Sequence, residues 1–196
     1  MISNPFLRAV FGWDLARRDV PWVPAGYSTR CLEVGSGGGF YTGALARHLG
    51  SRATLLSLDP DLDGLTVSRG LPVPPGAAPI HHLAADAGDL PLASSSVDAI
   101  FFAYCLEEMS DPCRALDEAY RVLRPAGWLV VFLWRPGMSV GRRKPVVASL
   151  NERFELDRER RGTQNIRLRF RRRPPERGDD ARRRDGDSPP EVTLRW

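Results

Sequence analysis

The sequence lacks the features of membrane, secreted and metal-binding proteins. Its 196 residues contain no apolar run near the roughly 20 residues that a membrane-spanning helix needs. Its N-terminus lacks a charged region followed by an apolar stretch and a small-residue cleavage site, which a secretory signal peptide would show. The 3 cysteines form no C-x-x-C pair, which disfavours a disulfide framework and a thiolate metal site. We therefore expect a cytoplasmic protein with no membrane span and no metal.

Acidic and basic residues are unevenly divided along the chain. Residues 1–134 contain 10 basic and 14 acidic residues, whereas residues 135–196 contain 18 basic and 10 acidic ones. The basic character behind the net charge of +4 therefore belongs to the C-terminal part. Hydrophobic residues make up 42% and charged residues 27%, which is typical of a globular protein and excludes a chain that is disordered throughout.

From Thr29 onward, short apolar runs alternate with helical stretches, which predicts a doubly wound α/β fold with a mostly parallel, Rossmann-like sheet. The predicted strands are residues 31–34, 53–58, 80–84, 97–102 and 128–134. The predicted helices between them are residues 40–49, 61–71 and a segment from Pro112 to a stop at Pro125. Further on, we expect a short helix over 145–153 and an antiparallel hairpin of strands 154–160 and 166–172.

Three regions are predicted along the chain. Residues 1–28 form an N-terminal cap, with an amphipathic helix over Asn4–Arg18. Residues 29–173 form the main domain. Residues 174–196 are a tail rich in Arg, Asp and Pro, and we expect it to be disordered because it has almost no apolar residues to bury.

A glycine-rich loop, E-V-G-S-G-G-G at residues 33–39, joins the first predicted strand to the first helix. Glycine is needed where the backbone has positive φ or where a ligand must approach the main chain. The loop has neither the dinucleotide fingerprint G-x-G-x-x-G nor a Walker G-K-[ST] sequence. Asp59, at the end of the next strand, is positioned to accept hydrogen bonds from a ribose. The carboxylate of Glu33 beside the loop suits a ligand that carries an ammonium or sulfonium charge.

Several sequence blocks, in order, resemble the class I S-adenosylmethionine-dependent methyltransferases. The resemblance covers about Thr29 to Trp134 and is closest to the small-molecule branch that includes the quinone-biosynthesis methyltransferases. The blocks are the loop 33–39, Asp59-Pro60, Ala85-Asp86-Ala87 with Leu90-Pro91, Ser96-Val97-Asp98-Ala99, residues 106–112 and residues 119–127.

The resemblance implies S-adenosyl-L-methionine as the cofactor and assigns its binding residues. Gly35, Ser36, Gly37 and Gly39 would hold the methionine part, with Glu33 orienting the amino group. Asp59 would bind the ribose hydroxyls and Pro60 would lie along the adenine. Asp86 would accept from the adenine amino group with Ala87 beside it, and Tyr104 and Cys105 would border the methyl end.

The catalytic residues are left open. Glu107 and Tyr104 are the first candidates for a general base, and Glu108, Tyr27 and the histidines are also considered. A base is needed only if the acceptor starts protonated, as a phenol or hydroxyl does. We expect methyl transfer to a small-molecule acceptor by in-line displacement. The alternatives are a nucleic-acid methyltransferase that uses the arginine-rich tail, and a cofactor-binding interaction protein without turnover. Two observations count against a nucleic-acid substrate: acidic residues are interleaved with the arginines of the tail, and the main domain is itself acidic.

Overall fold

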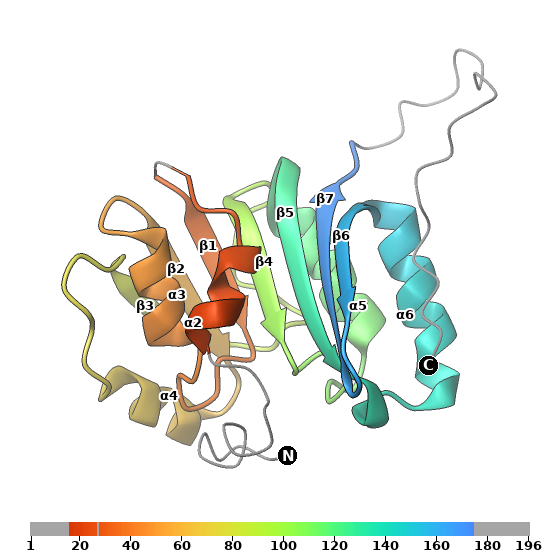
Figure 1. The fold of residues 1–196 in the computed structure, drawn as a ribbon, viewed down its shortest axis with the longest axis horizontal. Helices are drawn as coiled ribbons and strands as arrows, with labels where there is room; N and C mark the ends of the chain where they lie inside the picture. The colour runs from red at the N-terminus through yellow and green to blue at the C-terminus, as the bar shows by residue number, and fades with distance from the viewer. Residues whose placement is uncertain (1–15, 27, 175–196) are drawn as a thin grey trace.

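A computed structural model describes residues 16–26 and 28–174 of the chain. These residues form one seven-stranded sheet flanked by helices on both faces (Figure 1). The elements in chain order are α2 (Ala16–Asp19), η1 (Val20–Trp22), β1 (Arg30–Val34), α3 (Thr42–Leu49), β2 (Thr54–Asp59), α4 (Leu62–Arg69), β3 (Ile80–Ala84), β4 (Val97–Ala103), α5 (Pro112–Val122), β5 (Leu123–Trp134), η2 (Arg135–Gly137), α6 (Val140–Arg153), β6 (Phe154–Arg161) and β7 (Asn165–Arg172).

The strand order β3-β2-β1-β4-β5-β7-β6 reverses direction between β1 and β4. Strands β3, β2, β1, β4 and β5 are parallel, and β7 and β6 continue the sheet as an antiparallel hairpin. The predicted fold class and its C-terminal hairpin are therefore confirmed. In open sheets of this type, ligands bind beyond the carboxyl ends of the strands, at the point where the strand order reverses.

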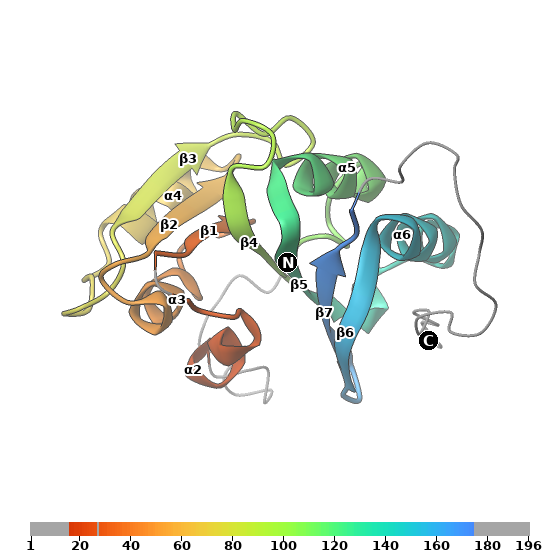
Figure 2. The same cartoon turned by 90° about the horizontal axis from the view of Figure 1, so that it is seen from above.

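Both faces of the sheet are buried, which explains the continuous apolar runs of the central strands. Helices α2 and α3 lie on one face, and α5 and α6 lie on the other (Figure 2). On the α3 face, Tyr41, Phe101 and Phe132 pack edge to face, with ring centroids 5.1 to 6.4 Å apart. On the α5 face, Leu32 and Val34 of β1 join a cluster with Leu116 of α5. These two layers hold the carboxyl ends of β1 and β4 in fixed positions beside each other.

Three boundaries in the main domain differ from the prediction by three residues or more. Strand β5 begins at Leu123 immediately after α5 ends at Val122, and residues 124–127 loop out between the pairs Val97↔Leu123 and Ala99↔Trp128. Helix α6 begins at Val140, five residues earlier than expected, and contains Pro145. Buried Val146 and Leu150 pack that helix on the sheet, which outweighs the one backbone hydrogen bond that the proline removes.

The terminal predictions fall mainly outside the described residues. Of the helix expected over Asn4–Arg18, only residues 16–18 are described, and they belong to α2. The tail prediction also lies outside them, except for Pro174. No helix in the described ranges is long and apolar enough to cross a membrane.

Candidate functional site

A cleft of about 560 Å³ opens at the carboxyl ends of the parallel strands, at the reversal between β1 and β4. This volume is within the usual range for small-molecule and cofactor sites. Six of the expected cofactor residues line it: Gly35, Asp59, Pro60, Asp86, Ala87 and Cys105. The other five are Glu33, Ser36, Gly37, Gly39 and Tyr104, which lie outside its lining.

The glycine loop is folded tightly against the end of β2. The N–H groups of Gly35 and Ser36 both donate to the carbonyl of Leu58, at 2.8 and 3.1 Å. Gly35 has a φ of +72°, and a Cβ atom added there would lie 2.5 Å from the Cβ of Cys105. Gly37 has a φ of +50°, and a Cβ added there would meet nothing within 4 Å. Close packing of the chain against itself therefore requires glycine at position 35, whereas position 37 faces open space.

Substitution Gly35→Ala is expected to lower the free energy of unfolding by about 3 kcal/mol, because a methyl group adds a steric overlap to a left-handed backbone conformation. Gly43→Ala is the matched control, since Gly43 lies in α3 and a Cβ there meets nothing within 4 Å. In a helix that change is expected to raise stability by about 0.5 kcal/mol. Urea denaturation measures the free energy of unfolding of both variants. Equal changes in the two variants would contradict the requirement for glycine at position 35.

Asp59 connects the glycine loop to the start of α4. Its Oδ2 accepts from the N–H of Gly37 at 2.7 Å, and its Oδ1 accepts from the N–H of Asp61 at 2.9 Å. The side chain is 9% exposed and borders the cleft. A carboxylate offers about four lone-pair positions, so these two bonds leave capacity for ligand hydroxyls.

Glu33 lies beneath the loop, 2% exposed, and its Oε2 accepts from the hydroxyl of Thr42 at 2.7 Å. Burial raises the pKa of this carboxyl to about 7, and the hydrogen bond from Thr42 opposes part of that shift. A buried acid with a pKa near neutrality is sensitive to any positive charge brought close to it.

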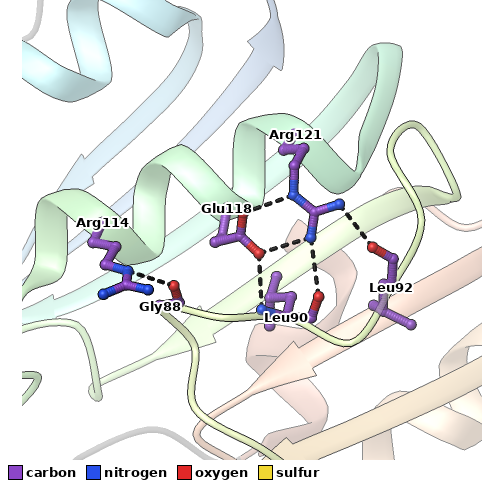
Figure 3. Close-up of polar contacts among 6 residues, drawn as sticks. All are labelled: Gly88, Leu90, Leu92, Arg114, Glu118 and Arg121. Atoms are coloured by element: carbon purple, nitrogen blue, oxygen red, sulfur yellow. Dashed lines mark hydrogen bonds and ion pairs between the residues drawn. The ribbon is translucent and has the colours of Figure 1, made fainter.

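Asp86 and Ala87 belong to the segment between β3 and β4, whose backbone is held by three side chains of α5 (Figure 3). The Arg114 Nε donates to the carbonyl of Gly88 at 2.7 Å. Glu118 accepts from the N–H of Leu90 at 2.8 Å. The guanidinium of Arg121 donates to the carbonyls of Leu90 and Leu92, at 3.0 and 2.8 Å.

Glu118 and Arg121 also form an ion pair, with two contacts of 2.7 Å. We call Arg114, Glu118 and Arg121 the α5 clamp. Their spacing of four and three residues puts all three on one face of the helix. The clamp fixes the segment 88–92, which continues directly from the cleft residues Asp86 and Ala87.

Tyr104 and Cys105 follow β4 and were both expected to border the methyl end of the cofactor, but only Cys105 lines the cleft. Cys105 borders the cleft, and its thiol donates to the carbonyl of Val34 at 3.1 Å. Burial raises the pKa of this thiol well above its usual range, so it stays protonated at neutral pH. Tyr104 has a φ of +57°, and its ring packs 5.9 Å from that of Phe132 on the α3 face.

The two glutamates after β4 also differ in position. Glu107 is 5% exposed, and its Oε1 accepts from the backbone N–H of Trp134 at 2.8 Å. It therefore connects the end of β4 to the end of β5. Glu108 lines the cleft, whereas Glu107 does not.

Sequence reasoning assigned no cofactor role to the part of the lining that comes from residues 108–115 and from Gly88 and Asp89. The available signal was the predicted helix start at Asp111 and Pro112, which begins α5 after the segment that follows β4. Including Glu108, five carboxylates line the cleft, against one guanidinium; they are Asp59, Asp86, Asp89, Glu108 and Asp111, with Arg114. This balance favours a positively charged ligand.

Residues 32–131 match a protein family described as "Methyltransferase domain". The ubiquinone/menaquinone biosynthesis C-methyltransferase UbiE of Vibrio cholerae is 28% identical over 127 residues, which are 64% of this chain and 46% of that protein. A SAM-dependent methyltransferase from Aquifex aeolicus has a similar structure, with a TM-score of 0.64, 20% identity and coverage of 86% and 98%. The [4+2]-cyclase SpnF gives a TM-score of 0.66, with 18% identity and coverage of 80% of each chain.

The chain therefore belongs to the methyltransferase-domain family, and within it to the class I S-adenosylmethionine-dependent methyltransferases. It spans about half the length of the curated relatives that it matches. The cofactor of this class is S-adenosylmethionine, which carries a sulfonium cation. The acidic cleft fits that group, because its lining carboxylates and its position at the strand reversal match a positively charged nucleoside derivative.

Proposed function

We propose that this chain transfers the methyl group of S-adenosylmethionine to a small-molecule acceptor by in-line displacement. The observation that carries the proposal is the acidic cleft at the strand reversal, whose lining includes Asp59 at the end of β2 and Asp86 after β3. When bound, the cofactor supplies an electrophilic methyl group, and the protein supplies orientation and electrostatics. Holding the acceptor atom about 3 Å from the methyl carbon can remove several kcal/mol of the barrier.

The proposed binding roles follow the cleft from β1 to β3. The loop Gly35, Ser36, Gly37 and Gly39, with Glu33 beneath it, holds the amino-acid portion. Asp59 accepts from the ribose hydroxyls, and Pro60 lies along the adenine. Asp86 accepts from the adenine amino group, with Ala87 beside it. Tyr104 and Cys105 border the methyl end, the former from behind the lining.

A general base is needed only for an acceptor that starts protonated. Of the two glutamates after β4, Glu108 is the better placed for that role, because it lines the cleft. Glu107 instead positions the end of β5 through the N–H of Trp134.

Calorimetric titration of S-adenosylmethionine and S-adenosylhomocysteine into the folded protein tests the proposal. We expect both to bind with micromolar affinity, and we expect methyl transfer in a screen of phenols, quinols and amines. Absence of binding by the folded protein would contradict the proposed function and would leave an interaction protein on this fold.

The raised pKa of Glu33 gives the proposal a pH dependence. In the folded protein Glu33 is protonated below about pH 7, and its ordinary pKa is 4.5. Because the folded state then binds more protons than the unfolded state, the contribution of Glu33 to stability falls as the pH rises from 4.5 to 7. A cofactor ammonium favours ionised Glu33, so affinity should rise through the same pKa.

We therefore expect the affinity for S-adenosylhomocysteine to rise about tenfold from pH 6 to pH 8, as the ionised fraction of Glu33 increases. Glu33→Gln keeps an acceptor for Thr42 but cannot ionise, so its affinity should be flat over this range. Titration calorimetry at pH 6, 7 and 8 measures both proteins. A variant that keeps the wild-type slope would show that another group causes it.

A further inference from the structure

A second hollow of about 290 Å³ lies beyond the carboxyl end of β5. It is lined by Arg135 and Pro136 of η2, Arg143 of α6, and Thr163 and Gln164 of the turn between β6 and β7. Figure 1 shows η2 and that turn at the lower edge of the sheet, where β1 and β4 also end. The hollow therefore opens at the same edge as the cofactor cleft.

The lining of this hollow combines two guanidinium groups with uncharged residues, and no described residue in it carries a carboxylate. Both arginines are held by the backbone. The Arg135 Nη1 donates to the carbonyl of Thr163 at 3.3 Å, and the Arg143 Nε donates to the carbonyl of Met138 at 3.0 Å. A guanidinium presents its N–H donors in a planar fork suited to carboxylate and phosphate oxygens.

The two parts of the described chain that carry the cleft and most of the hollow's lining have opposite net charge. The described residues 16–134 contain 9 basic and 13 acidic residues, a net charge of −4. The described residues 135–174 contain 13 basic and 4 acidic residues, a net charge of +9. An anion that approaches this edge is repelled from the acidic cleft and attracted toward the hollow.

The hollow and the cleft are connected through residues that are adjacent in sequence to the lining of the hollow. The Arg142 Nη1, next to Arg143, donates to the carbonyl of Met109 at 2.7 Å, and Met109 lines the cofactor cleft. Glu107 holds the N–H of Trp134, the residue before Arg135. A ligand group bound in the hollow therefore lies nearer to the Met109 part of the cleft lining than to the ends of β2 and β3, where Asp59 and Asp86 lie.

We propose that this hollow binds the anionic group, a carboxylate or a phosphate, of the methyl acceptor. The anion site stands on the lining residues themselves, whereas its assignment to the acceptor rests on the proposed function. The arginines bind the charged end of the acceptor, and the remainder of that molecule extends toward the cofactor.

Titration of benzoate, phenyl phosphate and neutral benzamide, followed by NMR of the ¹⁵N-labelled full chain, tests the site. We expect the two anions to bind in the millimolar range and benzamide not to bind. Arg135→Gln and Arg143→Gln should each weaken anion binding at least about tenfold, which is the expected loss for one charge-assisted hydrogen bond. Comparing benzoate with phenyl phosphate distinguishes a carboxylate site from a phosphate site.

Lys144→Gln is the matched control, because it removes the same charge from the next residue of α6 but does not line the hollow. Unchanged anion binding in Arg135→Gln and Arg143→Gln, equal loss in Lys144→Gln, or no binding by the wild type would each overturn the anion site.

The assignment to the acceptor is tested by repeating the titration with saturating S-adenosylhomocysteine. Because the contact between Arg142 and Met109 joins the two sites, the anion affinity should change at least about threefold, as expected for coupled sites. No change would overturn the acceptor role. Anion binding without any binding of S-adenosylhomocysteine would contradict the proposed function but not the anion site.

Discussion

Replacing Asp59 with asparagine is expected to weaken the binding of S-adenosylhomocysteine about 100-fold, a loss of about 2.7 kcal/mol. Both carboxylate oxygens of Asp59 accept backbone N–H groups, from Gly37 and Asp61. An asparagine of the same shape has one oxygen and one NH₂, so one of these N–H groups would face another donor. The unmade hydrogen bond costs about 1–3 kcal/mol, and the ribose loses its carboxylate partner as well.

The control for this experiment is Asp63→Asn, which makes the same change in charge on the first turn of α4. Asp63 is exposed and does not line the cleft. Calorimetric affinities of both variants should separate by about two orders of magnitude. Equal affinities, with Asp59→Asn folded by circular dichroism, would remove Asp59 from the site.

The sequence was sufficient to predict the sheet because local patterns and tertiary packing agree there. The run from Trp128 to Trp134 is continuously apolar because β5 is covered on both faces. The glycine loop follows β1 and folds against the end of β2, where Asp59 accepts from the N–H of Gly37. The position of Asp59 could also be predicted, because it is the last residue of β2 and its place follows from where that strand ends.

Other parts of the site depend on contacts between distant segments, which spacing alone does not specify. Glu107 and Glu108 are neighbours in sequence, yet the first is buried against Trp134 and the second lines the cleft. The α5 clamp also lay outside the prediction, because its partners are backbone groups of residues 88–92, about 30 residues away along the chain. Backbone partners leave no signature in side-chain identity.

Loss of the guanidinium at position 121 is expected to lower the free energy of unfolding by about 2 kcal/mol and to loosen the adenine side of the cleft. In Arg121→Met the side chain keeps its apolar length but loses its bonds to the carbonyls of Leu90 and Leu92. Glu118 then loses its ion pair and keeps the N–H of Leu90. The side chains of Arg121 and Glu118 are 36% and 18% exposed, so the expected loss of unfolding free energy is smaller than for a fully buried ion pair. Glu118→Gln, which removes the charge but keeps the shape, should cost about half as much.

Arg124→Met is the control, because Arg124 pairs with Asp98 of β4 and donates to the carbonyl of Ser95, partners that lie outside residues 88–92. A stability loss alone would not show that the clamp positions a ligand site, so the decisive measurement is a ratio of affinities. S-inosylhomocysteine lacks the amino group that Asp86 is proposed to accept from. We expect the wild type to prefer S-adenosylhomocysteine at least about tenfold, since an unpaired acceptor costs 1–3 kcal/mol. In Arg121→Met this preference should fall toward unity, and in Arg124→Met it should persist. A clamp that only stabilises the fold would weaken both ligands equally and leave the ratio unchanged, whereas a clamp that positions Asp86 must change it.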